Sequence, residues 1–161
     1  MRFDHQIGDG PERKPCNEPS RGIYYAAFSL SGCLVEVFGD VGSITPGNWR
    51  VARVRTTRSL RLLDLRDHGA TRAGSVAALA KIADRSLSQA WSRYFYETTD
   101  VYGAIDGVVY RNAHNDEAAL ALYERAADAL ICPPVQIIRL DDSSLRPHVL
   151  DAALRHNLDV I

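Results

Sequence analysis

Ile23-Tyr24-Tyr25-Ala26-Ala27-Phe28 is a nearly continuous apolar run in this 161-residue chain, and such a run predicts a buried strand. Ser29 follows and can cap a helix, because its side-chain oxygen accepts a hydrogen bond from a backbone N–H of the first turn. Gly39 stops a pattern of apolar residues at helical spacing, namely Leu30, Cys33, Leu34, Val37 and Phe38. The sequence therefore predicts a strand that runs directly into a capped helix.

Outside this unit, apolar periodicity predicts strands and helices in no regular alternation, which is typical of an α+β fold. Further strands are predicted at 49–54, 60–65, 104–110, 135–140 and 159–161, with a turn at 56–59. Helices are predicted at 75–83, 86–97 and 146–156, the second of them capped by Ser86. We expect one domain over residues 1–161, with a mixed sheet, flanking helices and a loop or arm at residues 4–20.

Two details of this pattern concern backbone geometry. Residues 115–130 favour a helix by propensity, since Asp116 is followed by alanines and leucines, but a strand over Ala119–Glu124 is the alternative. Gly107 lies inside the strand predicted at 104–110, where a glycine indicates a bulge or the close approach of another backbone.

Composition limits the classes of function. Net charge is −1, from 19 basic and 20 acidic residues, so the chain lacks the basic excess of a nucleic-acid-binding protein, although arginines cluster from Arg50 to Arg61. Cys16, Cys33 and Cys132 show no metal-ligand spacing and fit reduced thiols in a cytosol. We expect no metal site, no membrane span, since no apolar run approaches about 20 residues, and no targeting signal at the N-terminus.

Side chains suited to a phosphorylated ligand lie near the strand at 23–28. The guanidinium fork of arginine matches a phosphate, and Arg2 and Arg21 are the two candidates. Tyr24 and Tyr25 lie on opposite faces of the strand, so one can pack in the core while the other stacks on a flat ring in a cleft. The alternative is that the arginines are solvated and both tyrosines are core or rim residues.

Glu36 is the sharpest candidate for catalysis. No basic residue lies three or four positions away on its helix, so no local ion pair accounts for it. A carboxylate beside a cleft can stabilise an oxocarbenium-like centre or orient a ribose hydroxyl. The alternative is an ordinary solvated glutamate.

Polar residues follow the strand at 104–110 directly, in the segment Tyr110-Arg111-Asn112-Ala113-His114-Asn115-Asp116. Residues just past a strand end are well placed for binding, but the same composition is typical of a turn. His114 has no serine or cysteine partner in a nucleophile motif, and a nucleophile elbow, a P-loop and a dinucleotide fingerprint are missing.

Taken in chain order, these pieces resemble the RES-domain family, named for an arginine, a glutamate and a serine. The residues that carry the resemblance are Arg2-Phe3-Asp4, Arg21-Gly22-Ile23-Tyr24-Tyr25-Ala26-Ala27, Glu36-Val37-Phe38, Leu62-Leu63-Asp64-Leu65, Ala90-Trp91 and Asp106-Gly107-Val108-Val109-Tyr110-Arg111. The similarity runs over nearly the whole chain, in the family's order. It also favours the strand over Ala119–Glu124, because the family chain returns as a strand there.

Members of that family are typically toxins of bacterial toxin–antitoxin pairs with a fold like that of ADP-ribosyltransferases, and they consume NAD. The resemblance implies that this chain cleaves the nicotinamide–ribose bond of NAD in the bacterial cytoplasm, by hydrolysis or phosphorolysis and without a metal. It implies that Arg2 meets the phosphates of NAD, that Tyr25 flanks the nicotinamide and that Glu36 is the family's glutamate. Arg21, Tyr110 and Arg111 are further candidates for binding NAD.

Asn112 occupies the place of the family's serine, and an amide cannot supply a hydroxyl. A protein ADP-ribosyltransferase and a non-catalytic domain that binds a nucleotide or a partner are therefore alternatives. The resemblance implies a helix-turn-helix (Xre-like) antitoxin as partner, with no direct contact to nucleic acid or membrane; self-association stays open. Since the family usually carries a strand or helix before its arginine, we expect either a true start at Met1 or a missing upstream segment.

Overall fold

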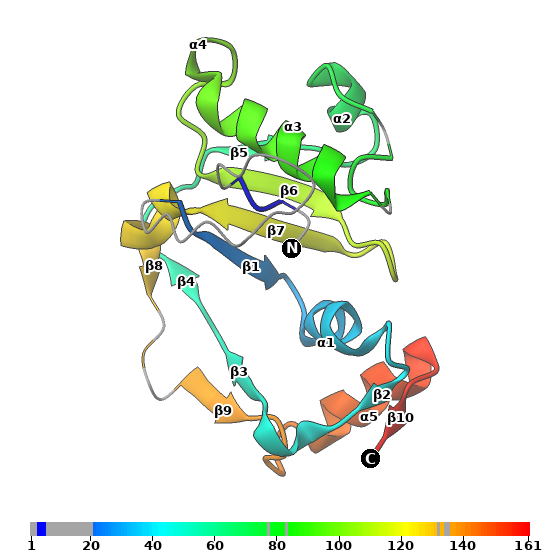
Figure 1. Ribbon diagram of the computed structural model, residues 1–161. Coiled ribbons are helices and arrows are strands. Elements are labelled where there is room, and N and C mark those ends of the chain that lie inside the picture. The colour runs from blue at the N-terminus through cyan, green and yellow to red at the C-terminus, as the bar shows by residue number, and fades with distance from the viewer. Residues whose placement is uncertain (1–2, 6–20, 77, 83, 132, 134–135) are drawn as a thin grey trace.

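The structure, a computed structural model, describes residues 3–5, 21–76, 78–82, 84–131, 133 and 136–161 (Figure 1). The loop or arm expected at residues 4–20 lies outside the described residues, apart from Asp4 and His5. The chain forms a mixed sheet with flanking helices, which confirms the α+β prediction.

Four strands form the main sheet in the order β1-β7-β6-β5. They are β1 (Ile23–Ala27), β5 (Leu62–Asp64), β6 (Gly107–Arg111) and β7 (Ala118–Tyr123). β7 lies antiparallel between β1 and β6, whereas β5 runs parallel to β6. The helix α3 (Arg85–Glu97) crosses one face of this sheet in Figure 1. β1 and β5 therefore lie at opposite edges.

The ambiguous segment 115–130 forms the central strand β7, followed by the 3-10 helix η2 (Glu124–Ala129). The strand alternative is thus confirmed. β7 pairs with a neighbour on each side and buries Ala119, Ala121 and Tyr123 in the main core. Pairing and burial on this scale outweigh the helix preference of alanine and leucine, which amounts to less than about 1 kcal/mol per residue.

At Gly107 the backbone of β7 leaves no room for a side chain on β6. A Cβ atom at this position would lie 2.4 Å from the carbonyl oxygen of Ala121 and 2.8 Å from Cα of Leu122. Both are backbone atoms, so neither can move aside without disturbing the sheet. The close backbone approach that the sequence pattern indicated is confirmed.

The helix α1 (Leu30–Phe38) follows β1 directly and begins where the sequence places it. The Ser29 hydroxyl oxygen accepts a hydrogen bond from the backbone N–H of Gly32 at 2.9 Å. At the other end, the N–H of Gly39 donates to the carbonyl of Val35 at 2.9 Å. Leu34 and Phe38 face the helix α5 (Arg146–His156), so α1 joins the sheet to the C-terminal part of the chain.

The remaining elements are short and lie below the main sheet in Figure 1, apart from α2 (Gly69–Arg72) and α4 (Thr99–Tyr102). Three two-stranded ladders join β2 (Ser43–Ile44) to β10 (Asp159–Val160), β3 (Arg50–Ala52) to β9 (Ile137–Arg139), and β4 (Arg55–Thr56) to β8 (Leu130–Ile131). A 3-10 helix, η1 (Pro46–Asn48), precedes β3.

Two apolar clusters hold the molecule together. The first packs the main sheet against α3 and includes Phe3, Phe95, Val108, Ala121 and Tyr123. The second packs α1 against α5 and includes Leu34, Phe38, Ile44, Val149 and Ala152. Because α1 belongs to the second cluster and follows β1 without a linker, its orientation depends on both.

Three local predictions are wrong. Described residues within 75–83 form turns rather than a helix, and the short helix α2 ends before Gly74, whose φ of +76° is unfavourable in a helix. The cap of α3 is Asp84, not Ser86: an Asp84 carboxylate oxygen accepts from the backbone N–H of Ser86 at 2.8 Å. The turn predicted to begin at Thr56 is displaced, because Arg55 and Thr56 form β4 and pair with β8, whereas the strand predicted at 49–54 is confirmed as the shorter β3.

Candidate active site

The first described residues of the chain, Phe3 to His5, pack on the main sheet, where Phe3 contacts side chains of both β1 and β6. Phe3 is fully buried, and its ring packs against that of Tyr110 with 4.7 Å between centroids. Its backbone N–H donates to the hydroxyl of Tyr25 at 2.7 Å, and its carbonyl accepts from the hydroxyl of Ser92 at 2.6 Å. These contacts hold the backbone that follows Arg2 in the chain. Arg2 itself lies outside the described residues.

His5 anchors the same segment at its other end. The imidazole is fully buried, with the rings of Tyr96 and Tyr123 at 4.4 Å and 4.7 Å between centroids. Its Nε2 lies 3.1 Å from a carboxylate oxygen of Glu124. Burial lowers the pKa of His5 below its ordinary value of 6.5; Arg21 acts in the same direction, while Glu124 and Asp4 oppose it. His5 is therefore held as a neutral ring.

We expect the free energy of unfolding to fall as the pH is lowered through 6.5, the ordinary value for histidine. The unfolded chain takes up the His5 proton more readily than the folded chain, so this contribution is complete above that pH and is lost below it. His5→Gln keeps a donor toward Glu124 but does not titrate. Urea unfolding at several values between roughly pH 8 and pH 5 gives the unfolding free energy of both proteins. This free energy should change less with pH in the variant than in the wild type, and the same pH dependence in both would contradict the assignment.

Tyr25 lies on the face of β1 that packs on the main core, whereas Tyr24 is 41% exposed on the other face. The expected division of the two tyrosines between faces is confirmed, but the residue proposed to bind is the inner one. Burial raises the pKa of Tyr25 well above its ordinary value of 10.0, and the negative charges of Asp4 and Glu36 add to this effect. The hydroxyl accepts from Phe3, so its own proton remains for a ligand.

Glu36 is exposed on the last turn of α1, the helix that follows β1. It lies close enough to Tyr25 and Cys33 to raise the pKa of each, as a minor contribution beside burial. Within the described ranges, its carboxylate makes no hydrogen bond or ion pair. Tyr110 is buried on β6 and also raises the pKa of Tyr25. Phe3 therefore contacts Tyr25 and Tyr110, and the charges of Asp4 and Glu36 lie close enough to act on the Tyr25 hydroxyl.

Asn112 is engaged in the turn between β6 and β7. Its side chain is 1% exposed; Oδ1 accepts from the backbone N–H of His114 at 2.8 Å, and Nδ2 donates to the carbonyl of Gly32 at 3.5 Å. Its backbone N–H donates to the carbonyl of Glu117 at 2.8 Å. These contacts are typical of an asparagine that shapes a turn, and they also tie that turn to the first turn of α1.

We expect Asn112→Ala to lower the free energy of unfolding by about 0.5–1.5 kcal/mol, because the backbone N–H of His114 loses its hydrogen-bond acceptor. The stability of Asn112→Ser should lie between that of the wild type and that of Asn112→Ala, because the shorter serine side chain reaches fewer partners. Denaturant unfolding measures the cost, and NAD titration of the folded proteins should give the same affinity for all three. Weaker NAD binding by the stable serine form would instead place residue 112 in the site.

The two other arginine candidates have structural partners. NH1 of Arg21 donates to a carboxylate oxygen of Glu97 at 2.7 Å and to the carbonyl of His5 at 3.2 Å. Arg111 donates to the carbonyl of Asp116 at 3.1 Å and lies 3.4 Å from the Asp67 carboxylate. Because side chains alternate along β6, Arg111 faces away from Tyr110. The structure does not bring either arginine to Glu36.

Comparison with known proteins bears on this arrangement. The family model described as "RES domain" matches residues 2–143. The chain belongs to the RES-domain family. RES domains are known from toxin–antitoxin systems that act on NAD. No curated protein and no solved structure matches the chain.

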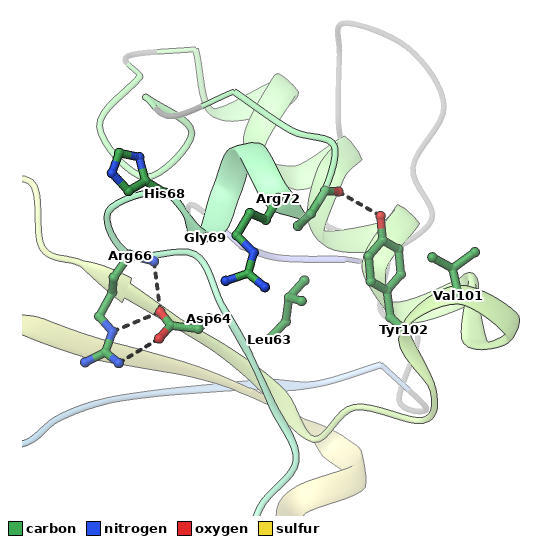
Figure 2. Close-up of a pocket in the computed structure, with 9 residues that line it drawn as sticks. Leu63, Asp64, Arg66, His68, Gly69, Arg72, Val101 and Tyr102 are labelled. Carbon is green, nitrogen blue, oxygen red and sulfur yellow. Dashed lines mark hydrogen bonds and ion pairs between the residues drawn. The ribbon is translucent and has the colours of Figure 1, made fainter.

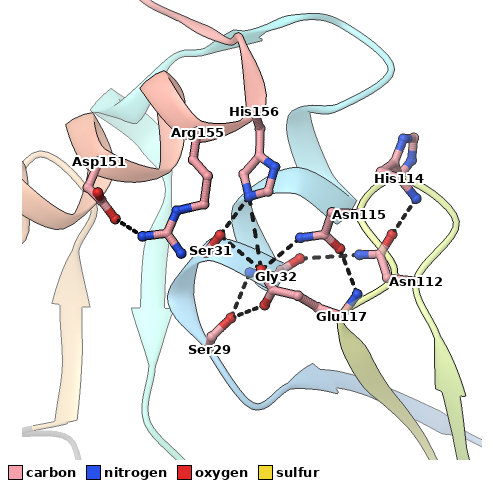
Figure 3. Close-up of polar contacts among 10 residues, drawn as sticks. All are labelled: Ser29, Ser31, Gly32, Asn112, His114, Asn115, Glu117, Asp151, Arg155 and His156. Carbon is pink, nitrogen blue, oxygen red and sulfur yellow. Dashed lines mark hydrogen bonds and ion pairs between the residues drawn. The ribbon is translucent and has the colours of Figure 1, made fainter.

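The sequence pattern did not reveal what positions α1 in this RES domain. Figure 3 shows a polar cluster at the first turn of α1, in which the Glu117 carboxylate accepts from the hydroxyls of Ser29 and Ser31 and from Nδ2 of Asn115. His156, at the end of α5, joins it with Nε2 at 2.8 Å from the Ser31 hydroxyl. Residues so far apart in the chain give no local signal, apart from the Ser29 cap.

This cluster is not arranged as a catalytic triad. His156 Nε2 lies 2.8 Å from Ser31 and 4.0 Å from Glu117, so the hydroxyl and the carboxylate approach the same ring nitrogen. In a triad the carboxylate holds the opposite nitrogen. The cluster instead ties α5, which lies beyond the matched residues, to the helix that carries Glu36.

Two classes of site find no support among the described residues. No group of three or more histidine, cysteine, aspartate or glutamate side chains there is arranged to hold a metal ion. No helix in the described ranges has the length and apolar character needed to cross a membrane.

Proposed function

We propose that this RES domain cleaves the nicotinamide–ribose bond of NAD and acts as the toxin of a toxin–antitoxin pair. The observation that carries the proposal is the match to the RES family over residues 2–143, which includes the expected arginine and glutamate positions. The contacts of Phe3 with Tyr25 and Tyr110, and the closeness of Glu36 to the Tyr25 hydroxyl, are consistent with it.

In this proposal each residue has a role that follows from the family resemblance. Arg2 binds the diphosphate through charge-assisted hydrogen bonds. The Tyr25 hydroxyl, which stays protonated, donates to a polar group at the nicotinamide end of NAD. Glu36 lies near that hydroxyl and stabilises the positive charge that develops on the ribose as nicotinamide departs.

In this proposal the acceptor of ADP-ribose is water or phosphate. In the alternative reaction, protein ADP-ribosylation, the acceptor is a protein side chain. A second candidate, a non-catalytic domain that binds a nucleotide or a partner protein, is favoured by one observation. The position of the family's serine is occupied by Asn112, and its side chain is engaged in a turn.

Incubation of the purified protein with NAD, with free nicotinamide measured over time, tests the proposal. Product analysis in phosphate and in phosphate-free buffer separates phosphorolysis from hydrolysis. Label transfer from radioactive NAD to added protein detects ADP-ribosylation. Absence of nicotinamide release by a folded protein that still binds NAD would favour the non-catalytic candidate.

The partner part of the proposal has its own experiment. Expression of the chain alone should slow bacterial growth, because NAD is depleted, and a helix-turn-helix antitoxin encoded nearby should restore it. Normal growth and normal NAD content with abundant folded protein would contradict the toxin assignment.

A further inference from the structure

A cavity of about 560 Å³ lies beside β5, at the opposite edge of the main sheet from β1. Figure 2 shows its lining, which comes from β5 and the loop after it, α2 and α4. Its volume falls within the range of about 300–1,000 Å³ that is usual for small-molecule sites. Tyr25, Tyr110 and Glu36 do not line it.

One wall of this cavity is apolar and firmly held. Leu63, Val101 and the ring of Tyr102 form it. The Tyr102 ring packs edge-on against Phe95 at 5.3 Å between centroids, and its hydroxyl donates to the carbonyl of Ala73 at 2.9 Å. That hydrogen bond joins the end of α4 to the end of α2. The wall can therefore receive a flat or apolar body without first being ordered.

On the side of the cavity opposite this wall, positive charge exceeds negative charge. Both carboxylate oxygens of Asp64 are occupied by the guanidinium of Arg66, at 2.9 Å and 2.7 Å, so this acid is neutralised. Its pKa is lowered by Arg66 accordingly. The guanidinium of Arg72 makes no hydrogen bond or ion pair within the described ranges, and Figure 2 shows it among the lining residues, between Asp64 and Tyr102. His68 adds a second nitrogen donor at the rim.

We propose that this cavity binds a small aromatic or apolar molecule that carries one phosphate or carboxylate. The planar donors of Arg72 match either anion and meet it in a site where no other acid competes. The apolar part lies against Tyr102 and Val101. Such a site is separate from that of NAD cleavage, because it lies at the other edge of the sheet.

Isothermal calorimetry with phenyl phosphate, benzoate and inorganic phosphate as probes tests this. We expect phenyl phosphate or benzoate to bind with a dissociation constant of about 1 mM or tighter, and inorganic phosphate to bind at least tenfold more weakly. Comparing the affinities of phenyl phosphate and benzoate identifies whether the site prefers a phosphate or a carboxylate. No detectable binding of either aromatic probe, or equal binding of inorganic phosphate, would overturn the proposal.

Three variants locate the binding. Arg72→Gln removes the cation, and Val101→Glu places a negative charge at a side chain that is 63% exposed, so both should fold and bind at least tenfold more weakly. Arg53→Gln removes an exposed arginine that does not line the cavity and should bind like the wild type. Thermal unfolding checks the folding of each variant. Unchanged affinity in Arg72→Gln would place the probe elsewhere and refute the assignment.

Discussion

Glu36→Gln should lower NAD turnover on the order of 10²-fold or more, with folding and NAD binding little changed. The amide keeps the shape of the side chain but removes the negative charge that, under the proposed function, stabilises the developing ribosyl cation. Glu36 is exposed, and within the described ranges it has no ion pair to lose, so the fold does not depend on its charge. Initial rates of nicotinamide release, at saturating and at limiting NAD, measure the effect.

A matched control is available at the end of the same helix. Asp40 is also exposed, and its closest ionic partner is His114 at 3.8 Å. Asp40→Asn removes one negative charge from the same region and should leave turnover within about twofold. If both variants kept wild-type rates, Glu36 would have no catalytic role. A loss of similar size in both would point to a general electrostatic effect.

Phe3→Ala should lower the free energy of unfolding by about 3–5 kcal/mol, the usual cost of deleting a buried phenylalanine ring. Phe3 is 0% exposed and packs on Tyr110, while its backbone binds Tyr25 and Ser92. The ring leaves a cavity between the sheet and α3 that these rigid elements cannot close. Urea unfolding followed by tryptophan fluorescence gives the difference.

Phe28 provides the comparison, because its side chain is 70% exposed. Phe28→Ala should change stability by no more than about 0.5 kcal/mol. Under the proposed function, Phe3→Ala should also weaken NAD binding, since the backbone next to Arg2 loses its anchor. A stable Phe3→Ala protein would mean that residues 3–5 contribute little to the fold.

The β1–α1 unit illustrates what local sequence can predict. A helix start depends on a few neighbouring residues, so Ser29 and the apolar spacing after it located α1 to the residue. The helix at 146–156 was found in the same way, from its periodicity. Between 75 and 83 the apolar pattern suggested a helix, but the described residues there form turns, because a weak local preference is overridden by what the segment packs against.

In the candidate site, too, some features could be predicted from the local sequence and others depend on the fold. Glu36 and Tyr25 could be proposed from the sequence because a motif with a recognised order surrounds them, and their proximity is seen only in the fold. Arg21 and Arg111 were the next candidates after Arg2, yet Arg21 is paired with Glu97, and Arg111 is engaged by Asp67 and the carbonyl of Asp116. No rule of spacing predicts such partners, since they come from other elements.

By itself, the sequence determined the α+β class, the strand–helix unit that carries Glu36 and the membership in the RES family, because propensity, capping and motif order are properties of neighbouring residues. Only the tertiary structure decided that the strand at 118–123 lies between β1 and β6, that Asn112 ties its turn to Gly32 of α1 and that His156 reaches back 125 positions to Ser31. Each of these depends on contacts between distant segments, and their energies are set by burial and pairing rather than by local preference.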